Sequence, residues 1–491
     1  MIPFAEWLPD LPDLENPGAT EALNVLPGSR SYIPLLGISP ITDAMNAFMR
    51  GGIAVRDKDD VVFNYAGNET KLYTISASAH TDATNVGAPY ALSDQENWEF
   101  HKWGEKVIAV AIDENPQIIS LGGTKFADLA GSPPKARHIA VINNFVVLAN
   151  LIEGGVAKPQ KVRWSAIDDE TDWTASATTQ SDSQELLSDS ESGGGWIMGI
   201  TGGEWGNVIM EYSTWRITYA GSPAIFQIEE VLPGVGTPAK NSITQEGRYT
   251  HFLSQEGFVQ LIDGFQVKYI GKEKVDTTFF KDLNDRYTHR IVSSSDPTSA
   301  IVCWIYPSTS STNGTPDKII CYNWFTERWT HGEIDLEWIY RALGQGYTLE
   351  GLDAVNTNLD TLTPSLDSRA WVGGELQMAI YDTSHKKGVL GGTALNGVIE
   401  TAEVNVNPGR RALITGVRPL VDGVTSSTVQ IGTRELQNDA VSFGSALTPH
   451  PSTGVAPARS DSRYHRFRVN TTGGFNHALG IDVEMDKSGY R

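Results

Sequence analysis

Short apolar runs that alternate with polar positions, separated by turn residues, recur along most of the chain. Groups of such runs begin near residues 52, 98, 138, 196, 242, 289 and 338. Intervals of about 40–60 residues are typical of a four-stranded propeller blade, and a closed ring removes the exposed edges of its sheets. The pattern therefore predicts an all-β fold with a β-propeller body of about seven blades over residues 51–382. A set of β-sandwiches is the alternative interpretation.

Local turn signals support strands rather than helices. Asn143-Asn144 separates the runs 138–142 and 145–148, and asparagine tolerates the positive φ that a tight hairpin turn needs. Helical periodicity is nearly absent, and we expect only a short helical turn at 277–283.

The first 50 residues predict an extended arm. Seven prolines in this stretch exclude a long helix or a central strand, although a short helix at 41–50 is compatible with the pattern. Apolar side chains suggest that the arm lies along its own body or along a neighbouring subunit. The candidates for subunit or adaptor contacts are Phe4, Trp7, Leu8 and Leu11. On this interpretation, deleting residues 1–20 should weaken assembly more than folding.

Composition changes near the end of the predicted propeller. Twelve of the 13 tryptophans lie between Trp98 and Trp371, and the last 120 residues have none. The glycine- and serine-containing stretch 383–397 is therefore predicted to be a linker. Beyond it, about six alternating runs with turn signals every 8–12 residues predict a compact β-sandwich-like domain over 398–491.

The distribution of charged residues along the chain also changes near residue 400. The chain has 38 Lys and Arg against 59 Asp and Glu, a net charge of −21. A module that binds nucleic acid needs a net positive charge. An acidic surface instead repels the DNA phosphates, so DNA can pass along it without being bound. Residues 401–491 are slightly basic, with 10 Lys and Arg against 8 Asp and Glu.

Arginines in this last part are the candidate docking residues. Arg463, Arg466 and Arg468 alternate by roughly two, so they are expected to share one face of a sheet. Together with Arg410 and Arg411 they are predicted to dock onto an acidic partner surface, and a solvated face is the alternative.

The sequence offers no catalytic pattern. Histidine spacings do not fit a metal site, there is no nucleophile elbow, and Cys303 and Cys321 are expected to be small buried hydrophobes. Paired carboxylates can hydrolyse glycosides, but the acidic segment 168–172 is expected to cap a turn while Trp173 packs between blades. We therefore expect no catalytic residues, no metal and no cofactor. A carbohydrate-binding or glycan-hydrolysing propeller and a scaffold propeller that recruits cellular proteins remain the alternative functions, although no blade carries the W-D or kelch signature of such scaffolds.

Targeting signals are also missing from the pattern. No run approaches the roughly 18 apolar residues of a membrane-spanning helix, so membrane insertion is not expected. Residues 1–6 lack the charged and apolar regions of a secretory signal.

Several segments carry a resemblance to known proteins. They are Val162–Ser165 with Thr171–Trp173, Val208–Gly221 with Phe226–Glu229, Phe252–Phe258 with Asp263-Gly264, Tyr322–Trp329, Ser365–Ser368 with Trp371–Gly374, Gly409–Ala412 with Val417–Pro419, and Tyr464–Arg468. All but the last cover residues 160–420 in order. Together they resemble one family, the propeller-bearing tail nozzle or hub (tail tube) proteins of short-tailed, podovirus-type bacteriophages.

The resemblance implies a structural virion protein rather than an enzyme. It implies a homohexameric ring in the virion tail, assembled in the bacterial host cytoplasm, that extends the DNA ejection channel below the portal-adaptor complex. Its implied partners are the portal-adaptor (head-to-tail connector) proteins, tail fibre or needle proteins, and genomic DNA that passes through the lumen without specific binding.

Overall fold

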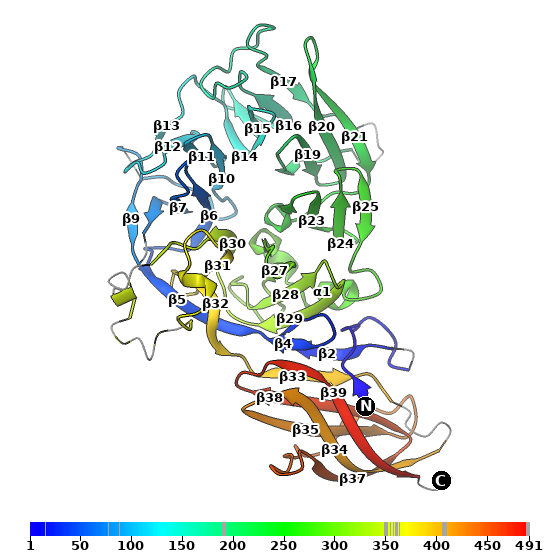
Figure 1. Ribbon diagram of the computed structural model, residues 1–491. Helices are drawn as coiled ribbons and strands as arrows, with labels where there is room; N and C mark the ends of the chain where they lie inside the picture. The colour runs from blue at the N-terminus through cyan, green and yellow to red at the C-terminus, as the bar shows by residue number, and fades with distance from the viewer. Residues whose placement is uncertain are drawn as a thin grey trace.

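Strands dominate the computed structural model of the protein. It describes residues 1–14, 16–76, 78–87, 89–188, 193–347, 352–353, 355–356, 358, 362, 364–404 and 410–487. Within these residues the chain forms an all-β fold of two parts, a β-propeller and a β-sandwich, which Figure 1 shows above and below one another.

Four-stranded antiparallel units make up the propeller. Four units follow one another in the first half: β6 (Met49–Arg56), β7 (Val62–Asn68), β8 (Leu72–Ile75), β9 (His80–Asp82); β10 (Glu99–Trp103), β11 (Lys106–Val110), β12 (Gln117–Ser120), β13 (Ala127–Asp128); β14 (Lys135–Ile142), β15 (Phe145–Glu153), β16 (Val156–Trp164), β17 (Asp182–Glu185); β18 (Ile197–Ile200), β19 (Trp205–Met210), β20 (Ser213–Gly221), β21 (Ile225–Pro233).

The second half of the propeller continues this arrangement. Its units are β22 (Thr244–Glu246), β23 (Tyr249–Ser254), β24 (Gly257–Ile262), β25 (Gln266–Tyr269); β26 (Val292–Asp296), β27 (Ile301–Tyr306), β28 (Lys318–Asn323), β29 (Arg328–Glu333); and β30 (Trp338–Leu343), β31 (Leu376–Tyr381), β32 (Lys386–Ala394) with β5 (Leu36–Ala44). The first strands of the units begin close to the predicted positions, at Met49, Glu99, Lys135, Ile197, Thr244, Val292 and Trp338.

The units are arranged around a common axis (Figure 1), and most neighbouring units contact one another through their first strands. β30 packs against β6, so the last unit meets the first and the ring is closed. Strand β5, from the N-terminal arm, pairs antiparallel with β32 and completes this last unit. The two ends of the propeller sequence are therefore held in one sheet.

This closure corrects two expectations. Residues 41–50 are not helical, because 41–44 belong to β5, 49–50 belong to β6, and 45–48 form the bend between these strands. The stretch 383–397 is not a linker, because β32 occupies 386–394. Its glycines serve close packing: a Cβ on Gly388 would lie 2.4 Å from the Ser39 carbonyl oxygen of β5. Composition alone does not distinguish such glycines from those of a flexible segment.

The local predictions agree with the structure. Asn143 and Asn144 have φ of 45° and 64° at the β14–β15 turn. The indole of Trp173 is buried between two units, and the Asp169 carboxylate caps its turn by accepting hydrogen bonds from the Thr171 amide at 2.8 Å and hydroxyl at 2.7 Å. The described helices are α1 (Asp276–Asp282), near the predicted helical turn, and the 3-10 helices Lys240–Ser242, Asp285–Arg290 and Arg369–Trp371.

The second part is a sandwich of two sheets. One sheet contains β1 (Ile2–Pro3), β3 (Val25–Pro27), β4 (Tyr32–Pro34), β39 (His477–Lys487), β34 (Ala412–Asp422) and β37 (Ala456–Ser462). The other contains β2 (Ala19–Leu23), β33 (Gly397–Thr401), β38 (Tyr464–Thr472), β35 (Ser426–Arg434) and β36 (Ser442–Phe443). The arm thus contributes strands to both sheets, which the predicted domain boundary at 398 did not include.

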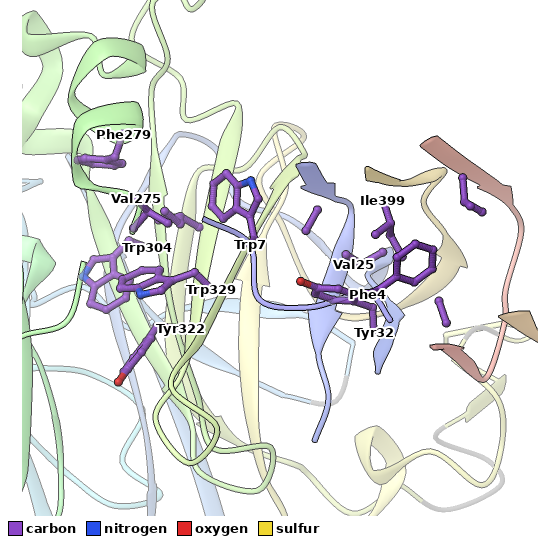
Figure 2. Packing of buried hydrophobic residues seen from close by; sticks show 14 of the residues in the cluster. Phe4, Trp7, Val25, Tyr32, Val275, Phe279, Trp304, Tyr322, Trp329 and Ile399 are labelled. Carbon is purple, nitrogen blue, oxygen red and sulfur yellow. The ribbon is translucent and has the colours of Figure 1, made fainter. Parts of the chain in front are cut away.

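The second sheet is continuous with the propeller. β2 pairs antiparallel with β33 and makes a parallel bridge to β29, where Leu23 lies opposite His331. This bridge joins the unit β26–β29 to the sandwich in one nine-stranded sheet. A single hydrophobic core accompanies it, and Figure 2 shows Trp7 between Trp329 on the propeller side and Ile399 on the sandwich side.

A buried histidine in this core predicts a pH dependence. His251 is fully buried, and its Nε2 atom accepts a hydrogen bond from the Gln260 amide at 3.0 Å. Burial lowers its pKa from 6.5 to about 3. Between these values the unfolded chain binds a proton that the folded chain does not, so stability is lost as the pH falls, by up to about 1.4 kcal/mol per pH unit.

We expect H251Q to remove this contribution. Thermal unfolding midpoints measured from pH 7 to pH 4 should fall less steeply for H251Q than for the wild type. The exposed His450 provides the matched control, H450Q, whose profile should run parallel to that of the wild type. Parallel profiles for H251Q and the wild type would contradict the assignment.

Candidate functional site

The predicted contact residues of the arm lie inside the chain's own core. Phe4, Trp7 and Leu8 are 3%, 4% and 7% exposed. The Trp7 ring stacks on His331 with centroids 4.4 Å apart, and its Nε1–H donates to the Thr20 carbonyl at 3.2 Å. Leu11 is half-buried. Phe4, Trp7 and Leu8 are therefore structural residues of the subunit and not contacts to a neighbour, because the arm strands pair with both parts of the chain.

Two of the predicted arginines form a buried ion network. Arg466 and Arg468 share a face of β38, as predicted, and both pair with Glu400 of β33. Arg463 was expected on the same face, but it precedes β38 and lies near Glu435 instead. The distances to the Glu400 carboxylate oxygens are 3.2 Å from Arg466 Nη1 and 2.7 Å from Arg468 Nη2. The Glu400 side chain is 6% exposed, and it also accepts a hydrogen bond from the Thr20 hydroxyl at 3.1 Å.

Further members of the network were not predicted. Arg434 pairs with Glu403, whose side chain is 1% exposed, and Asp13 of the arm pairs with Arg466 and lies 3.7 Å from Arg434 Nη2. These partners are far apart in the sequence, and no local pattern indicates that they meet. The network links Asp13 of the arm to Arg466 of the sandwich inside the same chain, so it does not form a docking surface.

The other predicted arginines lie at one end of the sandwich. Arg411 Nη2 is 2.9 Å from Glu435 Oε1, and Arg463 Nε is 4.0 Å from Glu435 Oε2. Arg410, which precedes Arg411 in the sequence, is exposed. Of these three residues, Arg410 and Arg463 are exposed, and Arg411, whose side chain is 30% exposed, is half-buried.

A cavity of about 240 Å³ lies on the propeller axis. The first strands of several units line it, including Trp98, Glu99, His138 and Tyr340. Its lining was not singled out from the sequence, although the first strand of each repeated unit is the one that faces the axis of a propeller. Such an axial cavity is the place where a catalytic or ligand-binding propeller would hold its substrate.

Basic side chains that line the axial cavity are paired with carboxylates, of which Glu99 lines the cavity and Glu96 does not. Arg137 donates to both carboxylate oxygens of Glu96, with Nε and Nη2 at 3.0 and 2.7 Å, and Lys240 Nζ lies 2.9 Å from the same carboxylate. Burial raises the pKa of Glu96, but the charges of Lys240 and Arg137 outweigh it, and the pKa is lowered. Glu99 pairs with His138 Nδ1 at 2.7 Å.

This electrostatic arrangement does not suit acid catalysis at Glu96. A general acid for glycoside hydrolysis needs a carboxyl whose pKa is raised toward neutrality, so that it carries a proton to the leaving group. Glu96 is shifted in the opposite direction.

Among the residues that the structure describes, no group of three or more His, Cys, Asp or Glu side chains is placed to hold a metal ion. None of the helices in the same residues has the length and apolar character needed to cross a membrane.

Comparisons with known proteins identify no family for this chain. No protein-family model matches the chain, and no curated protein does. Among solved structures, the chain is similar to the computationally designed Ika8 protein, with 9% sequence identity over 75% of this chain and 95% of that one, and a TM-score of 0.35. The fold therefore rests on the strand pairing of the chain itself.

Proposed function

We propose that the protein is a structural virion protein, the tail nozzle or hub of a short-tailed bacteriophage. In this role six copies form a ring that extends the DNA ejection channel below the portal-adaptor complex and offers attachment surfaces for tail fibres. The sequence similarity to that family motivates the proposal. Two of its segments correspond to supersecondary units of this fold: Val208–Gly221 spans the β19–β20 hairpin, and Tyr322–Trp329 spans the turn between β28 and β29.

One observation carries the proposal: the propeller and the sandwich are built as one body. The arm supplies strands to both, β2 continues the propeller sheet into the sandwich, and a buried ion network fixes the arm in place. An extended sheet shared by two parts resists their relative movement. Such stiffness suits a building block that transmits load in an assembly, whereas lids and hinges are typical of enzymes that close around substrate.

The electrostatics fit this role. Residues 1–400 carry 28 Lys and Arg against 51 Asp and Glu, so most of the negative charge belongs to the arm and propeller. An acidic wall repels the DNA phosphates within a Debye length of about 10 Å and prevents the genome from adhering during ejection.

Solution mass tests the proposal. Light scattering of the full chain, alone and after mixing with portal-adaptor proteins of the same virion, should reveal a species six times the chain mass of 53.5 kDa. The same samples should show no hydrolysis of a glycan panel. A chain that stays monomeric under both conditions and cleaves glycans would contradict the proposal and favour the carbohydrate-active alternative.

A further inference from the structure

The two cysteines of the chain meet across the middle of one propeller unit. Cys303 of β27 and Cys321 of β28 are direct partners in the antiparallel register, and their Sγ atoms are 2.9 Å apart. Both residues are 1% exposed and carry free thiols. The sequence predicted buried hydrophobic roles for them, and it gave no sign that they are neighbours.

Strand alternation explains why the thiols face one another. Ile301, Cys303 and Ile305 lie on the side of β27 that packs toward the unit of β30–β32, whereas Val302 and Trp304 lie on the other side. Cys321 of β28 lies on the same side as Cys303. Opposed residues of an antiparallel pair have Cα atoms about 4.5–5.5 Å apart, which lies within the range of about 4.4–6.8 Å that disulfides span.

We propose that Cys303 and Cys321 form a covalent modification site, a dithiol pair that a hydroperoxide converts into an intrachain disulfide. This inference goes beyond the proposed function and does not depend on it. The sulfur atoms are already closer than the roughly 3–3.5 Å typical of reacting atoms held in position for attack.

The reaction balances with hydrogen peroxide as the oxidant. One thiol loses its proton, and its sulfur attacks the O–O bond, which gives a sulfenic acid and, after protonation of the released hydroxide, one water. The second sulfur then attacks the sulfenic sulfur, the S–S bond forms, and a second water leaves with the remaining thiol proton. Two thiols are oxidised, and one peroxide is reduced to two waters.

The surroundings make this reaction slow in the folded protein. The contact with Cys321 and the loss of hydration on burial raise the pKa of the Cys303 thiol well above its usual value, and the thiolate is the reactive form. Oxidation therefore requires peroxide to enter the apolar layer between two units when that layer opens transiently. Once one sulfur has reacted, the neighbouring thiol completes the disulfide without further opening.

The disulfide would strengthen the unit that carries the sandwich. β27 and β28 are the middle strands of the unit whose sheet continues through β2 into the second part of the molecule. A covalent link between them restricts the unfolded chain and raises the unfolding temperature.

Thiol counting on the full chain tests the proposal. Reduced protein is exposed to increasing hydrogen peroxide, quenched with catalase, unfolded and treated with N-ethylmaleimide. The alkylated thiols should fall from two per chain to none, with a cross-linked peptide joining Cys303 and Cys321, and dithiothreitol should restore both thiols. The matched variant C303S leaves Cys321 without a partner, so it should keep its thiol or gain oxygen but form no intrachain link.

Two results would overturn the proposal. One is a folded wild type that keeps both thiols at every peroxide concentration and exposure time up to those that begin to unfold the protein. The other is oxygen addition to the sulfurs without a disulfide. A second measurement needs no variant: the thermal midpoint of the oxidised wild type should exceed that of the reduced wild type, and a lower midpoint would contradict the strengthening.

Discussion

Replacing Trp7 by alanine is expected to lower the free energy of unfolding by about 3–5 kcal/mol. Trp7 is 4% exposed, and its ring stacks on His331 at the junction of arm, propeller and sandwich. Its removal leaves a cavity in the core that joins the two parts, and the rigid strands around it cannot collapse to fill the space. Urea unfolding followed by circular dichroism and by tryptophan fluorescence measures the loss.

A matched variant separates burial from a general effect of altering the arm. Leu14 lies in the same arm and is 49% exposed, so L14A should change stability by less than about 0.5 kcal/mol. If W7A and L14A unfolded alike while W7A alone lost assembly, the arm would serve a neighbouring subunit instead of its own core. Deletion of residues 1–20 was expected from the sequence to weaken assembly more than folding. Because the arm lies in the core of its own chain, we now expect this deletion to destabilise the subunit itself.

The second large effect is expected for E400Q. Glu400 neutralises Arg466, whose side chain is 10% exposed, and also pairs with Arg468. Glutamine keeps the size of the side chain but removes its charge, so a buried guanidinium loses its main counter-charge. Breaking a buried ion pair in this way costs about 3–5 kcal/mol, and partial exposure of Arg468 places the expected loss near the lower limit.

A more exposed ion pair in the sandwich, between Glu435 and Arg411, provides the control. Glu435 is 41% exposed and pairs with Arg411, so E435Q should cost less than about 1 kcal/mol. Unfolding midpoints of both variants in the same buffer give the comparison. Equal losses would mean that the Glu400 network is solvated and does not hold the arm in place.

Local patterns predicted the units of the propeller because a hairpin is determined by residues that are close together in the sequence. Asn143-Asn144 specifies a turn by its own backbone preference, and alternation within each run specifies the buried face. These signals placed the first strand of each unit without any knowledge of distant contacts.

Long-range pairings could not be obtained in this way. The apolar character of Phe4 and Trp7 indicates burial but not the surface that buries them. The glycines of β32 have the composition of a linker, although they are there because β5 approaches closely. Likewise, nothing near Arg434 in the sequence identifies Glu403 and Asp13 as its partners, since the three are brought together only by the fold.

Imaging of the assembled protein tests the central claim most directly. We propose that this chain is a structural building block whose copies surround a channel, and not a catalyst that works as a single molecule. Class averages of the full chain with its portal-adaptor partners, from negatively stained samples, should show a hollow six-fold ring. Separate molecules, with no bore between neighbouring copies under these conditions, would contradict the account.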